Sequence, residues 1–224
     1  MARVRCDNDD WYRNGAWTPE IERAFRERLG RSRSNGLKAQ YLRIQGVTLI
    51  ERGDAPLARA GLALCAEVLE RFPDQRSEHA ACWRHTADAH RALGDAHEEL
   101  ACLRRGVACE RAFPNATAGN ALALALWLAR FGAPSDAPEI EAALALDTDH
   151  GARLFPRAAF ELEFVRAVLA AWRGDSAAAD HASRAFAAAR RTTSWLWRHA
   201  TLGLVRSVPA DMDARLRAIV ARGR

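Results

Sequence analysis

Four glycines recur along the chain at intervals of 41, 38 and 42 residues, and each ends a run that is compatible with a helix: Gly53, Gly94, Gly132 and Gly174. After Gly53, Gly94 and Gly174 an aspartate follows directly, and an alanine-rich second run comes next. Pairs of helices repeated about every 34 to 47 residues are typical of an α-solenoid, in which each unit buries its apolar face against its neighbours. The spacing therefore predicts an all-α repeat protein.

The composition agrees with a folded helical chain. Of the 224 residues, 49% are hydrophobic, alanine is abundant, and the strand formers Val, Ile and Tyr are few. The longest apolar stretch, residues 121–129, is far shorter than the roughly 18 to 20 residues that cross a bilayer. The first ten residues carry charges and no apolar core, which argues against a signal peptide. Because the five cysteines follow no framework spacing, we expect reduced thiols in a cytoplasmic protein that contacts no membrane.

Capping signals and apolar periodicity predict one helix followed by five helix pairs. Thr18 is a good N-cap, Pro19 suits the first helical position, and Phe25 and Leu29 lie on one apolar stripe of a helix that stops near Gly30. The expected pairs span residues 38–52 and 55–71, 76–93 and 95–113, 116–131 and 136–146, 157–173 and 175–191, and 193–206 and 209–222.

Two regions are expected, a polar leader with its capping helix at residues 1–37 and a single continuous array at residues 38–224. The aromatic residues of the leader, Trp11, Tyr12 and Trp17, are expected to pack over the open end of the array, because terminal repeats need a cap. Contact between these aromatic residues and a ligand is the alternative.

Small residues recur at fixed sequence positions before and after the turn glycines. Gly46, Ala87 and Ala167 lie seven positions before them, and Ala58 and Ala179 lie five positions after. This register resembles the tetratricopeptide repeat family, which has small residues where two helices of a hairpin approach closely. The resemblance covers residues 38–191, is degenerate in the third and fifth pairs, and implies a right-handed α-solenoid of about five such hairpins. The residues at 10–14 and 38–45 also resemble the start of uncharacterised bacterial repeat proteins.

The resemblance also implies a binding groove lined by the first helix of each pair. The positions assigned to this groove are Arg43, Ile44 and Val47 in the first pair, Arg84, His85, Asp88 and Arg91 in the second, Leu122, Leu126 and Arg130 in the third, and Phe164, Val168 and Trp172 in the fourth. A groove that is cationic at one end and apolar at the other predicts a protein or peptide partner of acidic and apolar character. Solvated arginines beside an ordinary buried helix are the alternative.

A bacterial adaptor or scaffold is therefore the expected function, with an immunity or inhibitor protein that covers a toxin as the alternative. The charge is uneven: residues 131–152 hold five acids and no Lys or Arg, while residues 184–224 hold nine arginines and two aspartates. Such asymmetry could support self-association into a homo-oligomer or steer an acidic partner. Nucleic-acid binding is not expected, because no recognition motif accompanies the arginines. An RNA-binding helical repeat and an all-α enzyme without known motifs remain the alternatives of another class.

Residue types that bind metals lie near one another in the second pair: Cys82, His85, His90, His97 and Cys102. Because Cys82 and His85 are expected to face different surfaces and no CxxC or HExxH pattern occurs, we expect no metal site. Residues 147–151 resemble the start of a calcium loop that lacks its final glutamate. Motifs for hydrolysis, phosphate binding and dinucleotide binding are missing as well, so we expect no catalytic residue and no cofactor. Trp83 is expected to be buried between the two helices of its hairpin.

Overall fold

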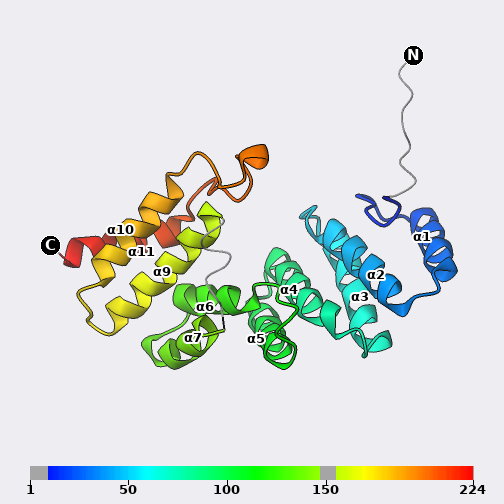
Figure 1. Cartoon of the computed structure of the whole chain (residues 1–224), viewed down its shortest axis with the longest axis horizontal. Helices are drawn as coiled ribbons and strands as arrows, with labels where there is room; N and C mark the ends of the chain where they lie inside the picture. Colours follow the sequence, from blue (N-terminus) through cyan, green and yellow to red (C-terminus); the bar gives the residue numbers. More distant parts are fainter. Residues whose placement is uncertain (1–9, 147–154, 224) are drawn as a thin grey trace, which may run out of the picture. The chain divides into compact units, whose positions relative to one another are not determined.

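The computed structural model describes residues 10–146 and 155–223, and every regular element in these ranges is helical (Figure 1). The residues divide into two compact units, Met1–Asn120 and Ala121–Arg224, and each is described by itself. The possible calcium loop at residues 147–151 lies outside the described residues. None of the described helices combines the length and the hydropathy that a membrane span requires. The sequence-based prediction of an all-α chain is confirmed.

Five helices form the first unit: α1 (Pro19–Arg31), α2 (Asn35–Ile50), α3 (Ala55–Arg71), α4 (Arg76–Leu93) and α5 (Ala96–Ala112). Helix α2 packs on α3, α4 packs on α5, and both α2 and α3 pack on α4. The side chains of Thr18, Asp54 and Asp95 accept hydrogen bonds from backbone N–H groups in the first turns of α1, α3 and α5. The first two predicted helix pairs are therefore confirmed.

The turn glycines fall into two kinds. Gly53, Gly94 and Gly174 adopt left-handed φ angles of +73°, +77° and +69°, a region that favours glycine because it has no Cβ. At Gly94 the N–H of Asp95 donates to the carbonyl of His90, and that of Gly94 donates to Arg91, which together form a Schellman motif. Gly132, which lacks a following acid, is not among the left-handed glycines of the described chain.

The core of the first unit depends on a close approach of α2 and α3 at Gly46 and Gly61. A Cβ added at Gly61 would lie 2.6 Å from the carbonyl oxygen of Gly46 and 2.6 Å from Cγ1 of Ile50. Leu42 on α2 and Leu64 on α3 are fully buried in the same apolar cluster. Small residues at the crossing therefore set the spacing of the first hairpin.

The leader packs on α1 and α2 through its aromatic residues. The rings of Trp11 and Tyr41 lie 4.9 Å apart between centroids, and those of Trp17 and Phe25 lie 5.4 Å apart. The backbone N–H of Asn14 donates to Oε1 of the buried Gln45 at 2.9 Å, and Nε2 of Gln45 donates to the Asn14 carbonyl at 2.8 Å. These paired hydrogen bonds hold the segment that carries the aromatic residues.

The second unit contains α6 (Asn120–Phe131), α7 (Ala137–Leu144), α9 (Pro156–Trp172), α10 (Ala178–Ala189) and α11 (Ala210–Arg222), with short 3-10 turns at Pro134–Asp136 and Trp197–His199. Helix α9 packs on α10 and α11, and α10 packs on α11. The guanidinium of Arg130 on α6 binds both carboxylate oxygens of Asp211 on α11, at 2.9 and 3.0 Å. Residues 121–129, the longest apolar stretch, lie within α6.

Glu163 on α9 links this helix to α10 through its carboxylate. Its carboxylate accepts hydrogen bonds from Arg166, His181 and Arg184. Burial raises the pKa of Glu163, but the hydrogen bonds from Arg184, His181 and Arg166 outweigh burial and hold the pKa below its ordinary value. An ionic cluster therefore joins the two helices of this hairpin.

The predicted helix at residues 193–206 is wrong, because only Trp197–His199 forms a 3-10 turn there. The backbone N–H of Ser194 donates to the Ala200 carbonyl at 2.6 Å, and the Ser194 hydroxyl donates to the His199 carbonyl at 3.0 Å. These bonds close a loop and occupy groups that a helix would need. The second unit thus ends in a single helix, α11, rather than in a fifth hairpin.

We predict that Gly61→Ala lowers the free energy of unfolding by about 1 to 3 kcal/mol, because the added methyl group collides with the backbone of α2. The control is Gly30→Ala in α1, where a Cβ would meet nothing within 4 Å and helix propensity should add about 0.5 kcal/mol of stability. Urea unfolding followed by circular dichroism measures both. Equal stability of the two variants would contradict the close approach.

Candidate functional site

The predicted groove positions of the first two pairs lie on α2 and α4, which pack against each other. Arg43 on α2 is joined to Glu78 on α4 by a hydrogen-bonded ion pair of 2.5 Å. Ile44 and Val47 lie along the same helix as Arg43 and are half-buried. The structure therefore places these predicted positions on two neighbouring helices.

The arginines of the predicted groove are paired with acids. Arg84 lies 3.4 Å from Asp88 and also donates to the Gly119 carbonyl at 3.0 Å. Arg91 pairs with Asp88 and lies 3.5 Å from Glu99. These ion pairs offset the positive charge of α4, so the cationic end expected from the sequence has little net charge to attract an acidic partner.

His85 lies between these charges. Its two ring nitrogens are shielded from solvent and make no hydrogen bond to any described residue. Burial, reinforced by the positive charges of Arg43 and Arg84 and opposed by Asp88, lowers the pKa of His85 to about 4. The ring is therefore neutral near pH 7 and acts as a packing group.

The predicted positions of the second unit differ in exposure. Phe164 and Val168 are 0% and 1% exposed, so placing them on a binding surface was wrong. They are buried because α9 packs against both α10 and α11. Leu122 and Leu126 on α6 are half-buried.

Two other predicted positions of this unit take part in contacts between helices. Trp172 is half-buried, and the guanidinium of Arg215 lies 5.4 Å from its ring centroid. Arg130 is occupied by its bidentate pair with Asp211. Both side chains therefore join their helices to α11.

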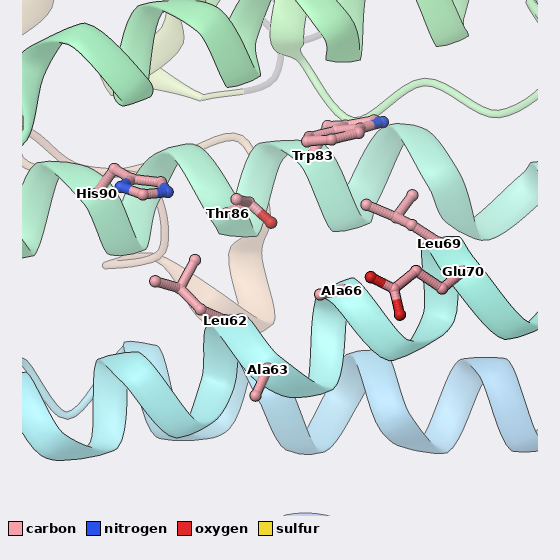
Figure 2. Close-up of a pocket in the computed structure, with 8 residues that line it drawn as sticks. All are labelled: Leu62, Ala63, Ala66, Leu69, Glu70, Trp83, Thr86 and His90. Carbon is pink, nitrogen blue, oxygen red and sulfur yellow. The ribbon is translucent and has the colours of Figure 1, made fainter.

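An open groove of about 560 Å³ lies between α3 and α4 (Figure 2). From α3 it is lined by Leu62, Ala63, Ala66, Leu69 and Glu70, and from α4 by Trp83, Thr86 and His90. Figure 2 shows the α4 side chains in a row above those of α3, with Trp83 near Leu69 and with His90 at the other end, above Leu62. The lining is mostly apolar, and its polar groups are few.

Trp83 forms part of this groove and is half-buried, so its expected burial within the hairpin is wrong. The guanidinium of Arg105 on α5 lies 5.0 Å from the centroid of the Trp83 ring. Ala63 and Ala66, the small residues of α3 in the groove, are themselves exposed and leave part of the aromatic surface accessible. The side chain therefore joins the α4–α5 hairpin and also faces the groove.

Three side chains with metal-binding atoms meet near the His90 end of the groove. A ring nitrogen of His90, a carboxylate oxygen of Glu98 and Sγ of Cys102 lie within 4.8 Å of one another. Burial raises the pKa of Cys102 to about 11, with smaller contributions from Glu98 and Asp95, while Arg105 opposes the shift. The thiol is therefore protonated near pH 7 when only protein surrounds it.

Sequence reasoning missed the α3 side of the groove and Glu98. A signal for the groove was present, because α3 carries Leu62 and Leu69 beside its buried stripe of Leu64 and Val68, more apolar positions than one packed face requires. For Glu98, positions 95, 98 and 102 fall on one face of a helix at spacings of three and four.

Comparison of this chain with protein-family models, curated proteins and solved structures finds no match.

We predict that His85→Gln reduces the loss of stability in acid. The pKa of His85 is about 4 when folded and about 6.5 when unfolded, so the unfolded state takes up the proton first as pH falls from 6.5 to 4. Wild-type protein should therefore lose about 2 kcal/mol more free energy of unfolding than His85→Gln between pH 7 and pH 4.5. Urea unfolding at the two pH values measures this difference. Equal losses in the two proteins would contradict the buried neutral ring.

Proposed function

We propose that this protein is an adaptor or scaffold that holds an apolar segment of a partner protein in the groove between α3 and α4. The supporting observation is the open groove of about 560 Å³ with its half-buried Leu62, Leu69 and Trp83. Apolar side chains that are left partly exposed side by side are typical of interaction sites. Trp83 also belongs to the residue types that contribute most to binding energy.

The dimensions of the groove favour a short amphipathic helix as the occupant. Leu62 and Leu69 are seven residues apart on α3, which corresponds to about 10 Å along the helix axis. This length matches two apolar side chains seven positions, or two turns, apart on a bound helix. Ala63 and Ala66 provide room between the two leucines, and Trp83 offers an aromatic surface.

Recognition in this proposal depends on apolar contact rather than on the arginines of α2 and α4. Arg43 and Arg84 are held by Glu78 and Asp88, so an acidic partner would have to displace existing ion pairs. Polar contacts to the partner come from the groove itself, where Glu70 and His90 lie. The expected acidic character of the partner is therefore not retained.

The repeat architecture belongs to the same proposal. We infer a tetratricopeptide-like arrangement in the hairpins α2–α3, α4–α5 and α9–α10. Support comes from the left-handed glycines at all three turns and from the buried small residues Gly46, Ala87 and Ala167, each seven positions before a turn. Such hairpins serve chiefly as rigid binding surfaces.

We predict that Ala66→Arg weakens partner capture, because the arginine side chain fills the groove. Tagged wild-type protein should capture a protein from a lysate of the source organism, identified by mass spectrometry. A66R should raise the dissociation constant for that protein at least tenfold, or about 1.4 kcal/mol. The matched control is Ala92→Arg on α4, an exposed position outside the groove lining, which should bind like the wild type.

Unchanged capture by Ala66→Arg, or loss of capture in Ala92→Arg alone, would contradict the groove between α3 and α4. Recovery of nucleic acid without a protein partner would contradict the interaction role itself. Because Ala66 is exposed, the substitution should change the free energy of unfolding by no more than about 0.5 kcal/mol. Circular dichroism checks that both variants remain folded.

A further inference from the structure

The second hairpin departs from the other two at three equivalent positions on its inner seam. These positions lie four residues before, four after and eight after the turn glycine. They are Leu49, Leu57 and Gly61 in the first hairpin, Ala170, Ala178 and Ala182 in the α9–α10 hairpin, and His90, Glu98 and Cys102 in the second. The first hairpin and the α9–α10 hairpin thus have small or apolar residues at these positions. The second hairpin, α4–α5, has an imidazole, a carboxylate and a thiol there instead.

The fold brings these three groups together at one end of the hairpin. Their ligand atoms lie within 4.8 Å of one another. His90 comes from the last turn of α4, Glu98 from the first turn of α5, and Cys102 from the next turn on the same face of α5. The Schellman motif at Gly94 fixes the path between the two helices, so the cluster is built on regular structure.

The state of the imidazole points to a missing partner. Nδ1 of His90 is shielded from solvent and makes no hydrogen bond within the described part of the chain. A buried polar atom without such a bond destabilises the fold and calls for an explanation. The nearest acid is Asp95, whose Oδ2 lies 3.6 Å away, while its Oδ1 accepts the N–H of Glu98 at 3.2 Å.

We infer that His90, Glu98 and Cys102 form a binding site for a zinc ion and that Asp95, whose Oδ2 lies 3.6 Å from Nδ1 of His90, moves in as the fourth ligand. Imidazole nitrogen, thiolate sulfur and carboxylate oxygen are the ligands of zinc, which binds them tetrahedrally at about 2.0 to 2.3 Å. Ligand atoms around such an ion lie about 3.3 to 3.8 Å apart, so the cluster has to close by at most about 1.5 Å on binding. The half-exposed side chain of Glu98 makes this movement by exchanging its 3.4 Å contact with His97 for the ion.

Binding of the ion forms a zinc–sulfur bond and releases the thiol proton of Cys102 to the solvent. The zinc then cross-links the last turn of α4 to the first two turns of α5. His90 is also a lining residue of the groove, so the metal fixes one end of the proposed binding surface. This combination of nitrogen, sulfur and oxygen ligands selects zinc over Mg²⁺ and Ca²⁺, because those two ions prefer all-oxygen ligands.

The test is calorimetric titration of the tag-free full chain with Zn²⁺, on a Cys6→Ser background so that the thiol of the leader does not contribute. We expect one ion per chain and a higher melting temperature with zinc. Cys102→Ser and His90→Gln should each weaken binding at least about 100-fold. Titration with Co²⁺ should give a thiolate-to-cobalt absorption band that Cys102→Ser removes.

The matched control is Cys109→Ser, a half-buried thiol seven residues further along α5, which should bind zinc like the parent protein. No stoichiometric binding, equal weakening in Cys109→Ser and Cys102→Ser, or equal affinity for Mg²⁺ would overturn the site. Ala66→Arg should keep full zinc affinity, so failure of the proposed groove and failure of the metal site can be told apart. Circular dichroism of each variant confirms that lost binding does not reflect unfolding.

Discussion

The left-handed turn at Gly94 is the constraint on which the second hairpin depends. With φ of +77°, Gly94 lets the chain reverse immediately after α4, and the N–H of Asp95 returns to the carbonyl of His90. The aspartate side chain then caps α5 by accepting from the N–H of Glu98. A reversal this short leaves α4 packed against α5, and left-handed glycines also stand at the turns of Gly53 and Gly174.

Both proposed sites follow from this turn. Because α5 is fixed against one face of α4, Trp83 lies under Arg105 on one side and faces the groove of α3 on the other. The same reversal brings His90 to Glu98 and Cys102. The face of α4 toward α2 is instead occupied by ion pairs and by the neutral ring of His85. Helix α4 therefore has one face on which the charges are paired and another face with open apolar surface.

The sequence predicted three hairpins well because their signals are local: cap residues, turn glycines and apolar stripes lie within a few positions of the features that they determine. Residues 193–206 form no α-helix because Ser194 closes a loop to Ala200. No local sequence pattern indicates this contact. The groove between α3 and α4 was harder to predict from the sequence. Contacts between helices, such as the ion pair of Arg43 with Glu78, determine which face of α4 stays open. Burial of Phe164 likewise depends on the packing of α9 against α10 and α11, which follow later in the chain.

The free energy of unfolding of Gly94→Ala, compared with that of Gly94→Asn, tests the role of this turn most directly. A Cβ at Gly94 meets no atom within 4 Å, so any cost comes from the backbone conformation alone. Alanine should lower the free energy of unfolding by about 1 to 2 kcal/mol, and asparagine, which tolerates the left-handed region, should lower it by less. If Gly94→Ala proved as stable as the wild type, the left-handed turn would not be the constraint that holds α4 and α5 together.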